Sequence, residues 1–341
     1  MKILFLTRRF YPHVGGVEKH IWKVSEWLIT EGHDVSIIAE NHSPSVLPVG
    51  WTTQKNLPVL FVNFGKESTW KKFHIWRWMI AHMRLFLQAD VIHAHDVMFW
   101  YFPLRFLLFW KPVYTTFHGD EKRFPPTKKA ISTRKLSAFL AKGSINVGSY
   151  LEKWYGVNAD VTIWGAVEKT AVLAKIMPDS PLHILLLGRL EKDISIQKYV
   201  ELLKKLKDEK FRFELDVCGD GTASMQLKKY GKMHGFVDDV NPYISESHVV
   251  FCSSYLAILE ALSQGRRIIA FYENPMKKDY LSLSPFAKWI CITDSVEEAA
   301  AYCVELGAKP YSQSQKSEID SYIKSISWDA IAHQYIHLWS K

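Results

Sequence analysis

MKILFLTRRFYPHVGGVEKHIWKVSEWLITEGHDVSIIAE, residues 1–40, contains two short apolar runs separated by a glycine pair and a helical pattern. Residues 3–6 are continuously apolar, as is typical of a parallel strand buried on both faces. Between residues 17 and 29 apolar side chains recur at helical spacing, and Gly32 follows where a helix is expected to end. Residues 35–39 form a second apolar run. The stretch therefore predicts a strand–helix–strand unit of an α/β fold.

Gly15 and Gly16 stand at the start of the predicted helix. Backbone N–H groups at such a position can approach a ligand closely, and the helix dipole favours negative charge there. The pair indicates either a phosphate site or an ordinary glycine turn. Because the spacing is not G-x-G-x-x-G, the dinucleotide-binding fingerprint is absent.

The composition favours two domains and an anionic partner. A chain of 341 residues that is 48% hydrophobic can bury two substantial cores. Its net charge of +8 fits nucleic acid, an acidic membrane surface or a phosphorylated metabolite. No nucleic-acid recognition module or basic-aromatic repeat is present, so we expect no nucleic-acid partner. The cysteines lack C-x-x-C pairing and the first apolar run is too short for a signal peptide, which favours a cytoplasmic protein.

Strand-like and helix-like patterns alternate in two separate series along the chain. This predicts two doubly wound α/β domains with a ligand cleft between them. We place the domains at 1–168 and 169–325, joined by an alanine- and proline-bearing connector, and expect the last helix, 326–341, to pack back on the first domain. Residues 41–58 are polar and proline-rich and predict a long surface loop.

Residues 70–87 predict one basic amphipathic helix rich in tryptophan. Such a helix can lie at a membrane interface, with the aromatic stripe in contact with lipid. Alternatively the stripe belongs to the core and the charges form a solvated face. The apolar stretch 97–110 is interrupted and too short to span a bilayer.

Histidines end two of the predicted strands, in the sequences His93-Ala94-His95-Asp96 and His118-Gly119. Open α/β sheets bind ligands at the carboxyl ends of their strands. We expect His93 and His95 to point to opposite faces of their strand, which argues against a metal site there. His118 is therefore the better candidate for contact with a substrate.

The order of these motifs resembles that of the family-four retaining glycosyltransferases of the GT-B fold, over essentially the whole chain. The first half contributes Gly15-Gly16-Val17-Glu18, Asp90 to His95 and His118-Gly119. The second half contributes Gly188-Arg189-Leu190, Gly219-Asp220-Gly221, His234 to Val237 and Leu259-Glu260-Ala261. The resemblance implies two facing Rossmann-like domains, the first for an acceptor and the second for a nucleotide sugar.

The resemblance also implies roles for individual residues. Arg189 and Lys192 would bind the donor diphosphate, and Glu260 would hydrogen-bond the ribose. Gly235, Phe236 and Val237 would border the base, Gly15 and Gly16 would face the diphosphate, and His118 would approach the transferred sugar. The donor would be a UDP- or GDP-linked sugar, and the acceptor a glycan or lipid-linked hydroxyl used in cell-envelope synthesis, at the inner face of the membrane.

Two departures bear on this activity. No Asp-x-Asp pair occurs in the sequence, so we expect no metal and assign the neutralisation of the diphosphate to Arg189 and Lys192. The family has a second glutamate in a loop before Glu260, and the corresponding position here is Cys252. The loop looks deleted, which leaves open a catalytically weak or inactive nucleotide-sugar-binding protein of the same fold.

Overall fold

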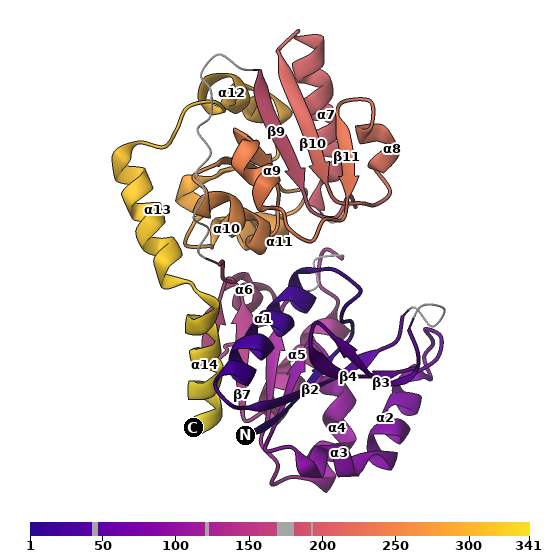
Figure 1. The fold of residues 1–341 in the computed structure, drawn as a ribbon. Coiled ribbons are helices and arrows are strands. Elements are labelled where there is room, and N and C mark those ends of the chain that lie inside the picture. Colours follow the sequence, from indigo (N-terminus) through magenta and orange to yellow (C-terminus); the bar gives the residue numbers. More distant parts are fainter. Residues whose placement is uncertain (43–46, 120–122, 169–180, 192–193) are drawn as a thin grey trace. The chain divides into compact units, whose positions relative to one another are not determined.

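The computed structural model describes residues 1–42, 47–119, 123–168, 181–191 and 194–341. The chain divides into two compact units (Figure 1). The N-terminal unit combines Met1–Ile163 with Trp328–Lys341, and the second unit is Trp164–Ser327. The last helix thus belongs to the N-terminal unit. Most of the connector expected from the sequence, residues 169–180, lies outside the described residues.

The described residues of the N-terminal unit form a sheet with strand order β3-β4-β2-β1-β5-β6-β7-β8, in which β3 is antiparallel to β4 and the other pairs are parallel. The strands are β1 Lys2–Thr7, β2 Asp34–Glu40, β3 Gly50–Gln54, β4 Leu57–Val62, β5 Val91–His95, β6 Val113–Phe117, β7 Gly143–Val147 and β8 Val161–Ile163. The helices are α1 Gly16–Thr30, α2 Lys71–Ala81, α3 Met83–Gln88, η1 Met98–Tyr101, α4 Phe102–Leu107, α5 Lys128–Leu140, α6 Tyr150–Tyr155 and α14 Trp328–Ser340.

Alternation along the central strand β1 sends side chains to two different layers. Leu4 and Leu6 join a buried cluster with residues of α2, α3, η1 and α4. Phe5 points the other way, where its ring meets Trp339 of α14. Helix α14 also packs beside α1 (Figure 1). The sheet is therefore covered on both faces, which explains why β1 is a continuous apolar run rather than an alternating one.

The second unit is built on a parallel sheet with order β11-β10-β9-β12-β13-β14. Its strands are β9 Leu182–Leu187, β10 Phe213–Cys218, β11 Lys232–Gly235, β12 Val249–Phe251, β13 Arg267–Phe271 and β14 Cys291–Thr293. Its helices are α7 Ile196–Asp208, α8 Ser224–Leu227, α9 Asn241–Glu246, α10 Tyr255–Ser263, α11 Pro275–Ser282, η3 Ala287–Trp289, α12 Val296–Leu306 and α13 Gln313–Ser325. Leucines of α7 and apolar residues of β9 share one buried cluster. Two doubly wound α/β units are thus confirmed.

The single helix predicted over residues 70–87 is wrong, because the chain breaks at His82 into α2 and α3. The ring of His82 stacks on Trp78, and its Nδ1 lies 2.9 Å from the Trp78 carbonyl oxygen. The core-facing side chains of α2 are Ile75 and Met79. Two aromatic side chains of the predicted stripe, Trp70 and Phe73, are instead exposed.

The predicted loop over residues 41–58 contains an edge strand, β3, among its described residues. Its sequence, Gly-Trp-Thr-Thr-Gln, has no apolar run because neither face of β3 is deeply buried. Pairing with β4, which the local sequence does not reveal, creates the strand. In the described part of the chain, we find no helix with the length and hydropathy needed to span a bilayer.

Candidate active site

The N-terminal unit contains a pocket of about 530 Å³ at the carboxyl ends of β1 and β5. Thr7, Arg8 and Arg9 line it from the end of β1, and His95 and Asp96 from the end of β5. Further lining residues are Val17 and Glu18 of α1, Lys71 and Lys72 of α2, Gly119 after β6, and Lys129 and Arg134 of α5. The start of α1, which contains the glycine pair, and the segment after His118 thus meet at one pocket.

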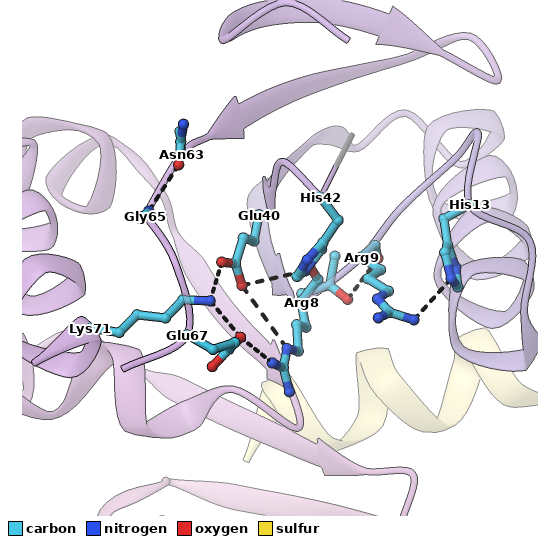
Figure 2. Close-up of polar contacts among 10 residues, drawn as sticks. Arg8, Arg9, His13, Glu40, His42, Asn63, Gly65, Glu67 and Lys71 are labelled. Atoms are coloured by element: carbon cyan, nitrogen blue, oxygen red, sulfur yellow. Dashed lines mark hydrogen bonds and ion pairs between the residues drawn. The ribbon is translucent and has the colours of Figure 1, made fainter. Parts of the chain in front are cut away.

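A partly buried ion-pair network forms one wall of the pocket (Figure 2). The Lys71 ammonium contacts the carboxylate of Glu40 and lies 2.7 Å from Glu67 Oε1. The Arg8 guanidinium reaches the same two acids, at 2.6 Å from Glu67 and 4.0 Å from Glu40. The hydrogen bond from Lys71 is the main cause that lowers the pKa of Glu67. Because Glu40 and Lys71 are buried, the charge of each offsets the cost of removing the other's charge from water.

A second chain of polar contacts joins Arg9 to α1. Arg9 Nη1 lies 2.9 Å from His13 Nε2, and His13 Nδ1 lies 2.9 Å from Glu18 Oε1. A guanidinium can only donate, so His13 Nε2 accepts and His13 Nδ1 carries the proton that it donates to Glu18. The network therefore fixes the tautomer of His13 (Figure 2 shows its contact with Arg9).

Four histidines gather behind the pocket, with residues of α14. His95 Nδ1 lies 3.0 Å from His118 Nε2, and the ring of His20 packs edge-on against His118. The Trp339 indole N–H donates to His93 Nδ1 at 3.1 Å. His93 is therefore protonated on Nε2, which donates to Thr116 Oγ1 at 2.7 Å. From Thr116 the chain of contacts continues through the Tyr335 hydroxyl, 2.8 Å away, to His20 Nε2, which is 2.9 Å from that hydroxyl.

The expectation that His93 and His95 point to opposite faces is wrong. Both rings contact Phe5 and Tyr335, and their centroids lie 5.1 Å apart. Residues two apart on a strand share a face, so the argument made from alternation fails. Among the described residues, no group of three or more His, Cys, Asp or Glu side chains is arranged to hold a metal ion.

Burial controls the charge of the histidine cluster. It lowers the pKa of His20 to about 3 and holds the pKa values of His93, His95 and His118 well below their usual range. All four rings are therefore neutral at physiological pH. A neutral His118 can donate or accept one hydrogen bond to a polyhydroxyl ligand without adding positive charge to the site.

Asp96 orients the segment that contains His118. Its backbone is left-handed, with φ of 60°, a conformation that aspartate tolerates better than most residues. The Asp96 carboxylate accepts the His118 backbone N–H at 3.1 Å and lies 3.5 Å from Arg134 Nη1. Gly119 follows with φ of 97°, and a Cβ there would fall 1.8 Å from the Tyr150 hydroxyl oxygen. Only glycine fits at this position.

Gly15 and Gly16 lie at the N-terminus of α1, with Gly15 as the capping residue. A Cβ on Gly15 would lie 2.4 Å from Glu18 Oε2, so the Glu18 carboxylate already lies beside this helix end. The negative charge of Glu18 interacts favourably with the positive end of the helix dipole. The prediction that the glycine pair faces a diphosphate stays a prediction.

In the second unit, glycines allow the strand-end loops to pack closely together. Gly188 ends β9, and a Cβ on Gly219, after β10, would lie 1.8 Å from the Gly188 carbonyl oxygen. Gly219 also bridges to Gly235, which ends β11. Arg189, the predicted diphosphate ligand, is exposed at this carboxyl edge. Lys192, its predicted partner, lies outside the described residues.

The remaining predicted donor residues lie at the end of β11 and on α10. Gly235 ends β11 with φ of 68°, Phe236 is exposed and Val237 is half-buried. Glu260 is half-buried on α10. Near Glu260, Cys252 is fully buried, and burial is the main cause that raises its pKa above the usual range, with a smaller contribution from the Glu260 charge. The buried Lys277 ammonium donates to the Ser253 carbonyl oxygen at 2.7 Å.

Sequence reasoning missed most of the polar network. Neither Glu40 nor Arg134 was singled out, and Lys71 was interpreted only as one charge of the predicted amphipathic helix. The contribution of α14 was also missed, because Tyr335 and Trp339 meet the histidines only through the tertiary fold. One available signal was the run Glu67 to Lys71, whose i,i+4 spacing favours an ion pair.

Comparisons with known proteins were made for both sequence and structure. Residues 14–164 match the model of Glycosyltransferase Family 4. No curated protein sequence matches the chain. Among solved structures, Anabaena HepE in complex with UDP and glucose has a TM-score of 0.72 at 14% identity, with 100% of both chains covered.

Two further solved structures share the fold. The lipopolysaccharide outer core galactosyltransferase WaaB in its apo form has a TM-score of 0.66 at 15% identity, with 99% of each chain covered. The catalytic domain of Arabidopsis thaliana starch synthase IV bound to ADP and acarbose has a TM-score of 0.63 at 13% identity, covering 99% of this chain and 98% of that one. The resemblance expected from the motifs is confirmed: the chain has the fold of GT-B glycosyltransferases, and its residues 14–164 match Family 4.

Proposed function

We propose that the protein is a retaining glycosyltransferase that moves a sugar from a UDP- or GDP-linked donor to a hydroxyl acceptor. The observation that carries this proposal is the Family 4 match over the unit that contains the neutral His118 and the glycine-led helix α1. The carboxyl-edge loops of the second unit, with Arg189 exposed beside them, support a donor site there. In this proposal the acceptor binds in the pocket of the N-terminal unit.

The proposed chemistry places charge on a departing diphosphate. The bond from the anomeric carbon to the β-phosphate oxygen breaks, and its electron pair stays with the phosphate. The acceptor hydroxyl oxygen forms the new bond and releases its proton to that phosphate. Arg189 and Lys192 would stabilise the developing charge in place of a metal ion, since the sequence lacks an Asp-x-Asp pair. Glu260 would hold the ribose, and Gly235 to Val237 would border the base.

Replacing Arg189 by alanine tests the proposed transfer. If its guanidinium meets the leaving diphosphate, Arg189→Ala should lower kcat by about 100- to 1,000-fold, the range seen for removal of one preorganised donor. Arg212→Ala, at another exposed arginine of the same unit, is the matched control. Transfer from radiolabelled UDP- and GDP-sugars to a panel of glycans measures the effect. Unchanged turnover in a folded Arg189→Ala protein would remove this role.

A second candidate function is nucleotide-sugar binding without efficient catalysis. The observation that favours it is Cys252. It is fully buried at the position that corresponds to the family's loop glutamate before Glu260. A buried thiol with a raised pKa stays protonated and offers the donor sugar neither a carboxylate nor an exposed group. Calorimetric binding of UDP and GDP beside the transfer assay separates the two functions. Tight nucleotide binding without transfer to any acceptor would favour the second.

We further propose that the N-terminal unit contacts an anionic membrane surface that contains a lipid-linked acceptor. Exposed aromatic side chains occur at the start of α2, at Trp70 and Phe73, and at the end of α4 and just after it, at Phe106, Phe109 and Trp110. Lys111 in that segment donates to the carbonyl oxygens of residues 87 and 89, so the segment lies beside the end of α3. Aromatic and cationic side chains together are typical of interfacial binding.

Sedimentation with liposomes tests the membrane contact. Vesicles with anionic lipid should bind the protein at low salt, and zwitterionic vesicles should bind it more weakly. Phe109→Ser with Trp110→Ser should reduce binding at least about tenfold, since each exposed ring contributes apolar burial. Phe139→Ser, at an exposed ring on α5, shows how far the contact extends. Equal sedimentation of wild type and the double variant would refute this surface.

A further inference from the structure

Three buried nitrogen atoms in the N-terminal pocket have no hydrogen-bond partner among the described residues. They are Arg9 Nε, Arg134 Nη1 and His95 Nε2, and all three side chains line the pocket. The side chain of His95 is 1% exposed and that of Arg134 is 12% exposed. Buried N–H groups in folded proteins are nearly always paired, so three exceptions at one cavity indicate a ligand with acceptor atoms.

The carboxylates around the pocket are already engaged. Glu18 accepts a hydrogen bond from His13 Nδ1. Asp96 accepts the His118 backbone N–H and lies 3.5 Å from Arg134 Nη1. Glu40 and Glu67 share the cations of their ion-pair network. Lys72 and Lys129 add two more positive charges at exposed positions on the pocket lining. Among the described residues of the lining, cations therefore outnumber carboxylates, which favours an anionic group over a neutral one.

We propose that this end of the pocket is an anion subsite that binds a carboxylate or phosphate group on the acceptor. The assignment rests on the proposed function, since it names the class of acceptor that the transferase uses. Arg9 and Arg134 donate their unused N–H groups to the anion, and the charge-assisted bonds fix its orientation. An acidic sugar or a sugar phosphate is the acceptor class that fits.

The anion also selects the tautomer of the histidine pair. A neutral imidazole carries one proton, so His95 can donate from Nε2 only when His118 Nε2–H donates to His95 Nδ1. Anion binding favours that arrangement and leaves His118 Nδ1 as an acceptor. His118 then accepts a hydrogen bond from a sugar hydroxyl, which links recognition of the anion to the positioning of the sugar.

The donor diphosphate is the other possible source of such an anion. The flanking carboxylates of Glu18 and Asp96 oppose a multiply charged diphosphate more strongly than a singly charged carboxylate. Phe99 and Trp100 also line the pocket, and aromatic side chains of this kind suit a sugar ring. We therefore assign the subsite to the acceptor, and the experiment distinguishes the two sources.

Thermal shift and calorimetry with matched probes test the subsite in the full chain. At constant ionic strength, glucuronate and inorganic phosphate should stabilise the protein. Glucose should bind at least about tenfold more weakly than glucuronate, a difference equivalent to one charge-assisted hydrogen bond. Arg9→Gln and Arg134→Gln should each reduce the affinity for glucuronate at least about tenfold. Arg77→Gln, an equal loss of charge at an exposed position of α2 outside the pocket, should leave it unchanged.

Nucleotide arms separate failure of the subsite from failure of the proposed function. The affinity for UDP or GDP should stay within about twofold in Arg9→Gln. Circular dichroism checks the fold of both arginine variants, since Arg134 also contacts Asp96. Equal binding of glucuronate and glucose, with sugar transfer intact, would overturn the subsite alone. A parallel loss of nucleotide and glucuronate affinity in Arg9→Gln would assign the anion to the donor and overturn the proposal. If Arg9→Gln loses glucuronate binding and the wild-type protein binds no nucleotide, the result would support the subsite and contradict the proposed transferase function.

Discussion

Replacing Lys71 by methionine should destabilise the N-terminal unit by considerably more than an ordinary surface change. Its ammonium is shared by Glu40 and Glu67, and the Lys71 side chain is 9% exposed. Methionine has similar length and preserves most of the packing. The change therefore removes mainly the charge, and it leaves the Glu40 carboxylate, 5% exposed, without its closest cation.

The expected magnitude follows from the partners that remain. Breaking a buried ion pair on one side costs about 3–5 kcal/mol. Arg8 Nε, 4.0 Å from Glu40, retains part of the charge compensation. His42 Nε2 lies 3.4 Å from Glu40, but burial lowers the pKa of His42, so its ring adds no charge at pH 7.5. We therefore expect Lys71→Met to lower the free energy of unfolding by about 2–3 kcal/mol, at or below the lower limit of that range. Glu67 is largely exposed and adds little.

Urea unfolding at pH 7.5 measures the effect. Monitoring it by hydrogen exchange of peptides from β2 and α2 restricts the measurement to the N-terminal unit. Lys72→Met, one residue further along α2 and exposed, is the control and should change stability by less than about 0.5 kcal/mol. Adding Glu40→Gln to Lys71→Met should restore part of the loss, because the uncompensated charge is then gone. Equal destabilisation by Lys71→Met and Lys72→Met would refute the reasoning.

Three further predictions address other parts of the structure. Acid should destabilise the N-terminal unit: burial lowers the pKa of His20 to about 3, while an unfolded histidine titrates near 6.5, so only the unfolded state gains the proton between these values. Stability is then full above about pH 6.5 and falls below it by up to about 1.4 kcal/mol per pH unit for each such histidine; equal urea midpoints at pH 7.5 and 5.5 would contradict this. Gly219→Ala should lower the unfolding free energy of the second unit by more than about 2 kcal/mol, because its Cβ would meet a backbone oxygen at 1.8 Å. Gly265→Ala, left-handed with φ of 67° but without a clash, should cost only about 1 kcal/mol, and similar values for the two would disprove the steric account. Trp339→Phe removes the indole N–H from a buried histidine ring and should cost about 1–3 kcal/mol in thermal unfolding, against less than about 0.5 kcal/mol for the exposed Trp110→Phe; indistinguishable losses would show that the indole hydrogen bond does not matter.

The fold was predictable because its main elements are buried on both faces. Parallel strands such as β1 appear as uninterrupted apolar runs, and β9 is apolar apart from His183. Elements without such burial were missed. The strand β3 is an exposed edge strand, and the break at His82 depends on a ring that stacks on Trp78. Neither leaves a strong local pattern.

The candidate site was less predictable because its contacts join distant parts of the sequence. His118 was singled out from its place after a strand, but its partner His95 was considered only as a metal ligand and set aside, because His93 and His95 were expected on opposite faces. His20 and Tyr335 are 315 residues apart and meet only in the folded unit. The position of Arg134 Nη1, which has no hydrogen bond but lies 3.5 Å from Asp96, likewise depends on how α5 packs, which local spacing does not encode.

Helix α14 gives the N-terminal unit a particular order of assembly. Residues 1–163 leave the ribosome long before Trp328–Ser340, which supplies two side chains to the buried histidine cluster. At typical elongation rates of about 5–20 residues per second, the intervening stretch takes roughly 10–30 s to synthesise. During that interval the sheet lacks its final cover and is open to chaperones and proteases. Synthesis of the last helix therefore completes the first unit as well as the chain.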